Sequence, residues 1–323
     1  MNKLIVICGP TCTGKTSLAI RMCQKYSGEI VSADSRQLFK YMDIGTGKRP
    51  ATSTKMGTVP NYVVGEGFWR VDGVYIHLYD VVEPDKKFSV ARFKDAATKE
   101  IESMWRRGKV PFLVGGTGFY IAAVLGETEF PRIPPDWELR KKLEKLSVEE
   151  LFTELQELDP VRAKNIDPKN PRRLVRAIEV VVNAPSGPRE LHSINVPLAD
   201  PSVASTLKIG LTADREVLYS RADAWAEGIV NNGLLDEVQN LINRGYKEAP
   251  PLQGIIYQSA LDHLDGKTTK EEMLERIKFD LHGYIRRQLT WFKRDKDIRW
   301  FNITESGFDL KVEEMIEFYL NEN

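Results

Sequence analysis

A glycine-rich turn between an apolar strand and a helix constrains this chain more than any other segment. The run Lys3–Cys8 is almost continuously apolar, which is typical of a parallel strand buried on both faces. Apolar residues recur at helical spacing over 16–26. Between them the sequence follows the pattern G-x-x-x-x-G-K-S/T, through Gly9, Pro10, Thr11, Cys12, Thr13, Gly14, Lys15 and Thr16. This unit predicts a phosphate-binding loop at the edge of a parallel sheet.

The chemistry of this loop is that of an anion site. Glycines let the backbone wrap closely, and the unpaired amides at the start of a helix favour a negative charge. Lys15 would add a positive charge against terminal phosphates, and the Thr16 hydroxyl would be the protein ligand of a magnesium ion, Mg²⁺. The motif leaves the ligand open, because nucleotides and prenyl diphosphates both carry a diphosphate. A chance turn with a surface lysine is the bland alternative, and the flanking strand and helix argue against it.

Composition excludes several other classes of protein. The chain has 323 residues, 42% hydrophobic and 28% charged, so we expect a globular core. Basic and acidic residues number 46 each, which excludes a polybasic coat for nucleic acid but not a local nucleic-acid site. No apolar run approaches the roughly 20 residues that span a bilayer. Cys8, Cys12 and Cys23 do not suit a disulfide scaffold, and we expect a cytoplasmic protein without membrane contact.

The order of strand and helix patterns predicts an α/β fold, a P-loop parallel-sheet core with a helical insertion domain. We expect strands over 3–8, 28–34 and 110–115, a short helix from Ser35, a hairpin turn at Asp72-Gly73 and a helix over 89–107. From about residue 125 charged amphipathic helices follow, and a strand over 207–211 returns to the sheet. The predicted core is therefore 1–124 and 201–323, with C-terminal helices, and the predicted insertion is 125–200.

Asp34 lies at the end of the second expected strand. Ligands of open α/β sheets bind at the carboxyl ends of the strands, so Asp34 would face whatever the phosphate loop holds. An aspartate here could equally cap a helix that begins near Ser35, a role that aspartate fills well. The position alone does not decide between a site residue and a helix cap.

An ordered series of motifs resembles the tRNA dimethylallyltransferase (tRNA isopentenyltransferase) family. It covers roughly residues 3–300 and consists of Gly9–Thr16, Asp34-Ser-Arg-Gln, Met42-Asp-Ile-Gly-Thr-Gly-Lys, His77-Leu-Tyr-Asp-Val-Val-Glu-Pro, Phe88-Ser-Val-Ala-Arg-Phe, Val114-Gly-Gly-Thr-Gly-Phe-Tyr, the segment from Asp159 to Val180, Gly233-Leu-Leu-Asp-Glu-Val and Arg286-Arg-Gln-Leu-Thr-Trp-Phe. Each motif alone is weak, and the family order makes the set specific.

The resemblance implies transfer of the dimethylallyl group of dimethylallyl diphosphate to N6 of adenosine 37 in the tRNA anticodon loop. By position, the phosphate loop would bind the diphosphate with Lys15, Arg221 and Mg²⁺ on Thr16. Asp34 would take the proton of the adenine amino group, and Thr117 would support the leaving diphosphate. Such chemistry needs cations and amides for the leaving group and a carboxylate beside the amine. The target base would be splayed out of the RNA.

Two local basic clusters are the candidate RNA surfaces. Residues 162–176 hold six basic residues against one acidic, and 281–300 hold six against two, with Trp291, Phe292 and Trp300 interleaved. Backbone contacts from basic residues plus aromatic stacking suit loop RNA. For Trp291 alone, core packing is the favoured alternative. The predicted tRNA contacts are Ser35, Gln37, Arg172, Arg173, Arg176, Arg286, Arg287, Gln288, Lys293 and Arg294.

The second half departs from the family pattern at several positions. Trp225 stands where the family usually has a second arginine four residues after the one that matches Arg221, and an aromatic ring lacks the charged donors of a guanidinium. Gln258 replaces a basic residue, Leu281-His282-Gly283 replaces Thr-Arg-Gln, and Asp167 replaces a histidine. Either Arg215 or Arg221 serves the diphosphate instead, or the activity or substrate differs.

Three other functions use parts of the same pattern. A nucleotide or small-molecule kinase needs the same loop and would bind ATP, but it has no need for the basic segments. A prenyltransferase acting on free adenine nucleotides would need no RNA surface. A non-catalytic RNA-binding protein could have kept the fold. We expect a monomer that binds tRNA and dimethylallyl diphosphate.

Overall fold

The computed structural model describes residues 2–49, 61–128, 133–184 and 204–322. The chain divides into two compact units, Met1–Glu127 with Ala199–Asn323, and Thr128–Leu198. The second unit lies inside the range 125–200 that was expected to be an insertion. Each unit is described by itself.

The first unit contains an eight-stranded sheet with the order β3-β4-β5-β2-β6-β1-β7-β8. β1 pairs in parallel with β6 and β7, β2 pairs in parallel with β5 and β6, and β7 pairs in parallel with β8. The strands are β1 Asn2–Cys8, β2 Gly28–Ser32, β3 Tyr62–Gly65, β4 Phe68–Val71, β5 Val74–His77, β6 Val110–Gly115, β7 Ala204–Thr212 and β8 Arg299–Asn302. The prediction of a parallel-sheet α/β core is confirmed, including the return of the chain to the sheet at β7.

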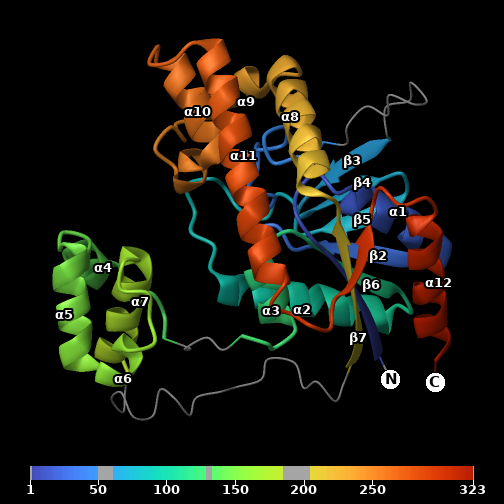
Figure 1. The fold of residues 1–323 in the computed structure, drawn as a ribbon, viewed down its shortest axis with the longest axis horizontal. Coiled ribbons are helices and arrows are strands. Elements are labelled where there is room, and N and C mark those ends of the chain that lie inside the picture. Colours follow the sequence, from blue (N-terminus) through green and yellow to red (C-terminus); the bar gives the residue numbers. More distant parts are fainter. Residues whose placement is uncertain (1, 50–60, 129–132, 185–203, 323) are drawn as a thin grey trace. The chain divides into compact units, whose positions relative to one another are not determined.

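Helices cover both faces of this sheet because the central strands are apolar on both sides. Ile5 and Ile7 of β1 pack with α1 (Lys15–Tyr26) and α12 (Phe308–Asn321). Leu4 and Val6 point the other way, toward α2 (Val90–Arg106) and α3 (Gly118–Val124). Figure 1 shows these two pairs of helices on opposite sides of the sheet. The alternation of side chains along a strand turns one apolar run into two cores.

Two local predictions had different outcomes. The hairpin between β4 and β5 is confirmed, and its turn residues Asp72 and Gly73 both have positive φ, 48° and 85°, as a tight hairpin turn requires. The short helix expected from Ser35 is wrong, since residues 35–38 form turns. The backbone here bonds to another segment instead of forming helical bonds: the Asp80 amide donates to the Gln37 carbonyl at 3.2 Å, and the Lys40 amide donates to the Val82 carbonyl at 2.9 Å. The Asp34 carboxylate accepts a hydrogen bond from the Arg36 amide at 2.8 Å within this turn.

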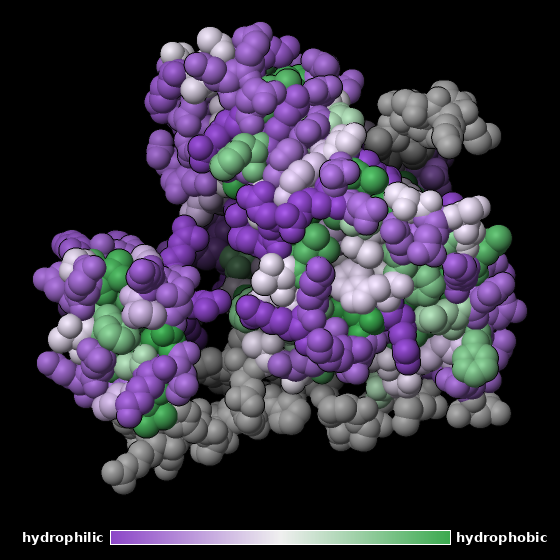
Figure 2. Space-filling view, in the orientation of Figure 1, coloured by the Kyte–Doolittle hydropathy of each residue, from purple (hydrophilic) through white to green (hydrophobic). Residues whose placement is uncertain are grey.

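A helical lobe completes the first unit. It consists of α8 Arg215–Asn231, α9 Leu234–Asn243, the short 3₁₀ helix Pro250–Gln253, α10 Ile255–Leu264 and the long α11 Lys270–Phe292. Leu241, Ile277 and Ile285 lie in its apolar core. Figure 1 shows α11 running from this lobe to α3, and the outward surface of the lobe is mostly hydrophilic in Figure 2. The long helix α11 therefore places some of its side chains in the lobe and others at the edge of the sheet.

The second unit is a small helical bundle. Its helices are α4 Trp137–Leu143, α5 Val148–Leu158, α6 Pro160–Ala163 and α7 Pro171–Val182. Leu155, Leu174 and Ile178 form the centre of its core. Ser147 and Glu150 form a capping box at the start of α5, and Asn170 caps α7 just before Pro171, which suits the first helical turn.

The buried carboxylate of Glu179 ties this bundle together. It accepts hydrogen bonds from the Asp136 amide at 2.6 Å and from Nε and Nη2 of Arg140, both at 2.7 Å, and it pairs with Arg176. Burial alone would raise the pKa of Glu179, but the bonds from Arg140 and Arg176 hold it below its ordinary value. Arg176 also donates to the Ile133 carbonyl at 2.8 Å.

We predict that Glu179→Gln destabilises the second unit, because two guanidinium groups lose their counter-charge at a side chain that is 0% exposed. The loss should be roughly 3 kcal/mol, the cost of removing one partner of a buried ion pair. Hydrogen exchange should show reduced protection of α4 and α7 amides relative to α11. The exposed Glu144→Gln is the matched control, and unchanged exchange in Glu179→Gln contradicts the prediction.

No helix of the described ranges is long and apolar enough to cross a membrane.

Candidate active site

The phosphate loop connects the end of β1 to the start of α1. Gly9 has φ 132°, and a Cβ there would clash with the Leu211 carbonyl oxygen of the neighbouring strand β7. Gly14 caps the helix with φ 82°, in the left-handed region that favours glycine. The first amides of α1 therefore lie at the end of a tightly wrapped loop, which is the arrangement of an anion site.

Lys15 closes this loop on itself. Its Nζ donates a hydrogen bond to the Pro10 carbonyl at 2.6 Å, and the Thr13 hydroxyl donates to the same carbonyl at 2.9 Å. Burial of the ammonium lowers the pKa of Lys15 to about 8, against the opposing influence of Asp34. A bound anion would raise this pKa again, because an opposite charge favours the ammonium form.

Asp34 faces the same site from the end of β2. Burial raises the pKa of its carboxyl group above the ordinary value, while the Arg36 amide and the charge of Lys15 act in the opposite direction. Lys15 and Asp34 each shift the pKa of the other, so the phosphate loop and the carboxylate share one electrostatic environment. The alternative role of Asp34 as a helix cap is wrong, because no helix begins there.

The loop after β6 holds Asp34 in place. The Thr117 amide donates to the Ala33 carbonyl at 3.1 Å, and the Thr117 hydroxyl accepts from the Ser35 amide at 3.1 Å. A Cβ on Gly115 would clash with the Ala33 carbonyl, so only glycine permits this close approach. Thr117 therefore positions the backbone on both sides of Asp34. Its predicted support of the leaving diphosphate stays a prediction.

The structure corrects the prediction that Gln288 contacts tRNA. Gln288 is only 5% exposed, and its amide group bonds to two loops of the protein: Oε1 accepts from the Thr11 amide and Nε2 donates to the Gly116 carbonyl, both at 2.9 Å. The sequence suggested an RNA contact because Gln288 follows two arginines, but these point to solvent and the glutamine points inward.

Two other predicted tRNA contacts have partners within the protein. The guanidinium of Arg176 binds Glu179 and the Ile133 carbonyl, and its side chain is 32% exposed, so its predicted contact with tRNA stays a prediction. The Gln37 side chain accepts from the Ser32 hydroxyl at 2.8 Å and donates to the Thr46 carbonyl at 3.1 Å. Gln37 therefore joins the Asp34 segment to the 42–48 segment.

The remaining predicted basic contacts are exposed. Arg221 is an exposed residue of α8 near the phosphate loop. Its nearness is seen at Cys12 in that loop: burial raises the pKa of the Cys12 thiol, and the positive charge of Arg221 is one of the influences that lower it. Solvent also reaches six further side chains, which are Arg172 and Arg173 on the first turn of α7, Arg286 and Arg287 on α11, and Lys293 and Arg294 just after it. Trp291 packs edge-on against Phe119 with ring centres 6.0 Å apart, in line with the core-packing alternative.

Sequence reasoning missed the role of Glu237. Its Oε2 accepts from the amides of Asp43 and Ile44, both at 2.7 Å, and its Oε1 accepts from the Gly45 amide at 3.1 Å and the Tyr257 hydroxyl at 2.8 Å. One buried carboxylate thus fixes the 42–48 segment against α9 and α10. Both segments were visible as motifs, but nothing in a linear pattern indicated that one binds the other.

The positions that depart from the family pattern have partners of their own. Trp225 packs over Gly47, 3.5 Å from where a Cβ would stand. His282 Nε2 lies 2.8 Å from Asp223 Oδ1, and its ring stacks on Tyr219 with centres 3.9 Å apart. Gln258 donates to Asp262 at 3.1 Å. These contacts explain how the lobe accommodates the unusual residues.

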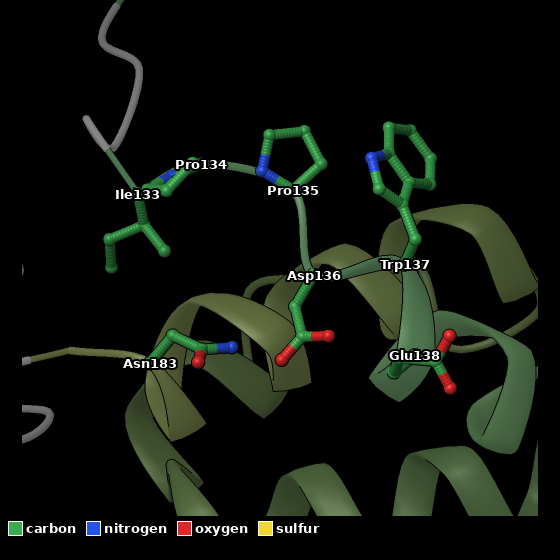
Figure 3. A pocket seen from close by; sticks show the side chains of 7 residues that line it. All are labelled: Ile133, Pro134, Pro135, Asp136, Trp137, Glu138 and Asn183. Atoms are coloured by element: carbon green, nitrogen blue, oxygen red, sulfur yellow. The ribbon is translucent and has the colours of Figure 1, made fainter.

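The second unit has a surface pocket of about 560 Å³, shown in Figure 3. Its lining consists of Ile133, Pro134, Pro135, Asp136, Trp137, Glu138 and Asn183. The Trp137 ring is 40% exposed, and the guanidinium of Arg140 lies 4.7 Å from its centre. None of the predicted site residues lines this pocket.

Comparison with known proteins assigns the chain to a family. The family described as IPP transferase matches residues 37–295, and the one described as isopentenyl transferase matches residues 2–68. The chain belongs to the IPP transferase family. It is 38% identical to a tRNA dimethylallyltransferase of Acetivibrio thermocellus, over 99% of this chain and 98% of that one. A tRNA dimethylallyltransferase of Roseiflexus castenholzii is 41% identical over 91% of this chain and 90% of its own length.

Solved structures agree with this assignment. The full-length tRNA isopentenylpyrophosphate transferase from Bacillus halodurans is 35% identical, with a TM-score of 0.68 over 99% of this chain and 96% of that one. A eukaryotic dimethylallyltransferase acting on tRNA shares the fold at 24% identity, with a TM-score of 0.79 over 100% of this chain and 81% of that one. In the ranges that the structure describes, the fold is therefore that of the IPP transferase family.

The donor set of the site suits a metal that arrives with its substrate. In the described ranges, no group of three or more histidine, cysteine, aspartate or glutamate side chains is placed to hold a metal ion. The Thr16 hydroxyl in the first turn of α1 is the oxygen that would bind the predicted Mg²⁺. Mg²⁺ is commonly held by one or two protein oxygens together with substrate phosphates and water, so a single hydroxyl is compatible with this ion, and the Mg²⁺ site stays a prediction.

We predict that Gly115→Ala destabilises the protein by about 1–3 kcal/mol, the usual cost of forcing extra atoms into a packed site. The new Cβ would push against the Ala33 carbonyl, next to Asp34. Thermal unfolding measures the effect. Gly228→Ala is the matched control, since nothing lies within 4 Å of its added Cβ in helix α8 and alanine favours helix there. If the two variants are equally stable, the close contact of Gly115 with the Ala33 carbonyl does not require glycine, and the prediction is wrong.

Proposed function

We propose that this chain transfers the dimethylallyl group of dimethylallyl diphosphate to N6 of adenosine 37 in the anticodon loop of tRNA, with release of diphosphate. The observation that carries this proposal is the pairing of a phosphate loop with a half-buried carboxylate: Lys15 and Asp34 lie close enough for each to influence the pKa of the other. A kinase can combine the same loop with a carboxylate, so this pairing does not by itself separate the two functions. Membership of the IPP transferase family, whose relatives are named for this transfer, supports the same conclusion.

In the proposed reaction the N6 lone pair attacks the allylic carbon of the prenyl group. The carbon–oxygen bond to the diphosphate breaks, and the diphosphate leaves with the bonding electrons. The loop amides and Lys15 face this negative charge, and Arg221 adds a further cation from α8. Mg²⁺ bound at the Thr16 hydroxyl would neutralise part of the diphosphate charge.

Asp34 is the proposed general base. N6 gains a positive charge as it forms the new bond, and its proton passes to the Asp34 carboxylate. Burial raises the pKa of Asp34, which makes it a better proton acceptor than an exposed aspartate. Thr117 and Ser35 hold the backbone around this carboxylate, so its position is set before the substrate arrives.

The tRNA contacts of the proposed enzyme are basic and exposed. Arg286 and Arg287 on α11 and Arg172 and Arg173 on α7 offer guanidinium groups to phosphates. Such contacts bind RNA without reading its sequence, and the target adenosine would be splayed into the Asp34 site. We propose that the enzyme acts as a monomer in the cytoplasm.

The proposal predicts that the protein with Mg²⁺ transfers label from dimethylallyl diphosphate to unmodified tRNA containing A36-A37-A38. Asp34→Asn should lower kcat by about 10²–10⁴-fold, the usual contribution of a general base, while tRNA binding stays unchanged. Free AMP and ATP are the control substrates. Labelled AMP, or ATP hydrolysis without prenyl transfer, would identify one of the alternative functions instead.

A pH profile tests the role of Asp34 independently. A base acts only when deprotonated, so the rate should fall as the pH drops through the pKa of Asp34. Since burial raises that pKa, the fall should occur at a higher pH than an exposed aspartate would give. The kcat/KM profile of the wild type shows the break, and the residual activity of Asp34→Asn should lack it. A profile that is the same in both proteins contradicts the assignment.

A further inference from the structure

Gln288 lies where the loops of the proposed site meet. It projects from α11 into the space between the phosphate loop after β1 and the Gly115–Gly118 loop after β6, and it is 5% exposed. α11 belongs to the helical lobe, so this side chain is the lobe's contribution to the edge of the sheet. Arg286 and Arg287 precede it directly and are exposed.

Both halves of the Gln288 amide are used. Its oxygen accepts from the Thr11 amide at 2.9 Å, and its nitrogen donates to the Gly116 carbonyl at 2.9 Å. A carboxylate could accept from Thr11 but could not donate to Gly116, and a shorter side chain would not span both loops. A Cβ on Gly116 would clash with the Gln288 nitrogen, so the contact also depends on glycine at that position.

The bond to Thr11 affects how a diphosphate can be held. The Thr11 amide is committed to Gln288, which leaves the later amides of the loop, toward the start of α1, for the anion. Gln288 thereby fixes the first half of the phosphate loop while the second half stays available.

The bond to Gly116 extends this link to the base. Thr117 follows Gly116 and bonds to the Ala33 carbonyl and the Ser35 amide, on either side of Asp34. A continuous path of hydrogen bonds thus runs from Thr11 through Gln288 to the backbone around Asp34. The two ends of this path are the loop that would bind the leaving group and the carboxylate that would take the proton.

We infer that Gln288 is a positioning residue for prenyl transfer: it sets the separation between the phosphate loop and the Asp34 loop and makes no contact with tRNA. This inference rests on the proposed function. The three residues Arg286, Arg287 and Gln288 then serve different substrates, the arginines facing the RNA and the glutamine the diphosphate site. Positioning matters because small displacements of reacting groups cost much of the rate.

Gln288→Glu tests this inference, because the change is nearly isosteric and removes the donor to Gly116. We expect a fall in kcat of at least about tenfold, and a higher KM for dimethylallyl diphosphate, with the Kd for tRNA unchanged. Gln288→Asn keeps the amide on a shorter side chain, and it should likewise lower kcat and raise the KM for dimethylallyl diphosphate without changing the Kd for tRNA. Titration with Mg²⁺ and inorganic diphosphate should show weaker binding in both variants.

Two comparisons separate this role from others. Gln239→Glu makes the same chemical change at an exposed position of α9 and should leave all constants unchanged. Arg287→Gln should raise the Kd for tRNA and leave the KM for dimethylallyl diphosphate unchanged. A loss of folded protein alone would reduce the apparent kcat and leave both KM values unaltered, so the rise in one KM excludes a merely structural role.

Three results would overturn the inference: a higher Kd for tRNA in Gln288→Glu with diphosphate constants unchanged, kinetics equal to the wild type, or a lower apparent kcat with both KM values unaltered. Failure of the proposed function is distinguishable, since it would appear as absence of prenyl transfer in the wild type. Diphosphate binding by the Gln288 variants would still test the link to the phosphate loop in that case.

Discussion

The parallel pairing of β2, β6 and β1 is the constraint on which the rest of the site depends. These three strands are neighbours in the sheet, so their carboxyl ends lie together at one edge. Asp34 and Thr117 lie in the loops that follow β2 and β6, and Lys15 is the first residue of α1, directly after the loop that follows β1. Residues far apart in the sequence therefore share one site without any long side chain having to reach across the molecule.

Close backbone contacts hold the loops at this edge of the sheet in fixed positions. Gly9 and Gly115 allow loops to pass against the carbonyls of Leu211 and Ala33, where any side chain would clash. Hydrogen bonds from Thr117 and Gln288 then join the loops to one another. Buried polar groups of this kind are costly when unpaired, and full pairing makes the arrangement specific as well as stable.

Buried carboxylates do comparable work elsewhere in the molecule. Glu237 accepts hydrogen bonds from three successive amides of the 42–48 segment. In the second unit, Glu179 pairs with two arginines and accepts a hydrogen bond from the amide of Asp136 at the start of α4. Each of them fixes a loop or a helix end through hydrogen bonds. In the 42–48 segment these bonds act together with apolar packing, since Met42 is fully buried in the core of the lobe.

The sequence by itself determined the phosphate loop, the parallel-sheet fold, the hairpin at Asp72-Gly73 and the family. Each of these depends on the spacing of neighbouring residues or on the order of motifs along the chain, and both can be read without a structure. Tertiary structure decided which way side chains in those motifs point. Gln288 follows two exposed arginines and yet turns inward, since its position on α11 faces the two loops. Asp34 starts no helix, because the backbone of Gln37 and Lys40 bonds to the 80–82 segment instead. The direction of each side chain depends on the groups that folding brings close to it. Those groups are distant in the sequence, so a local sequence pattern does not identify them.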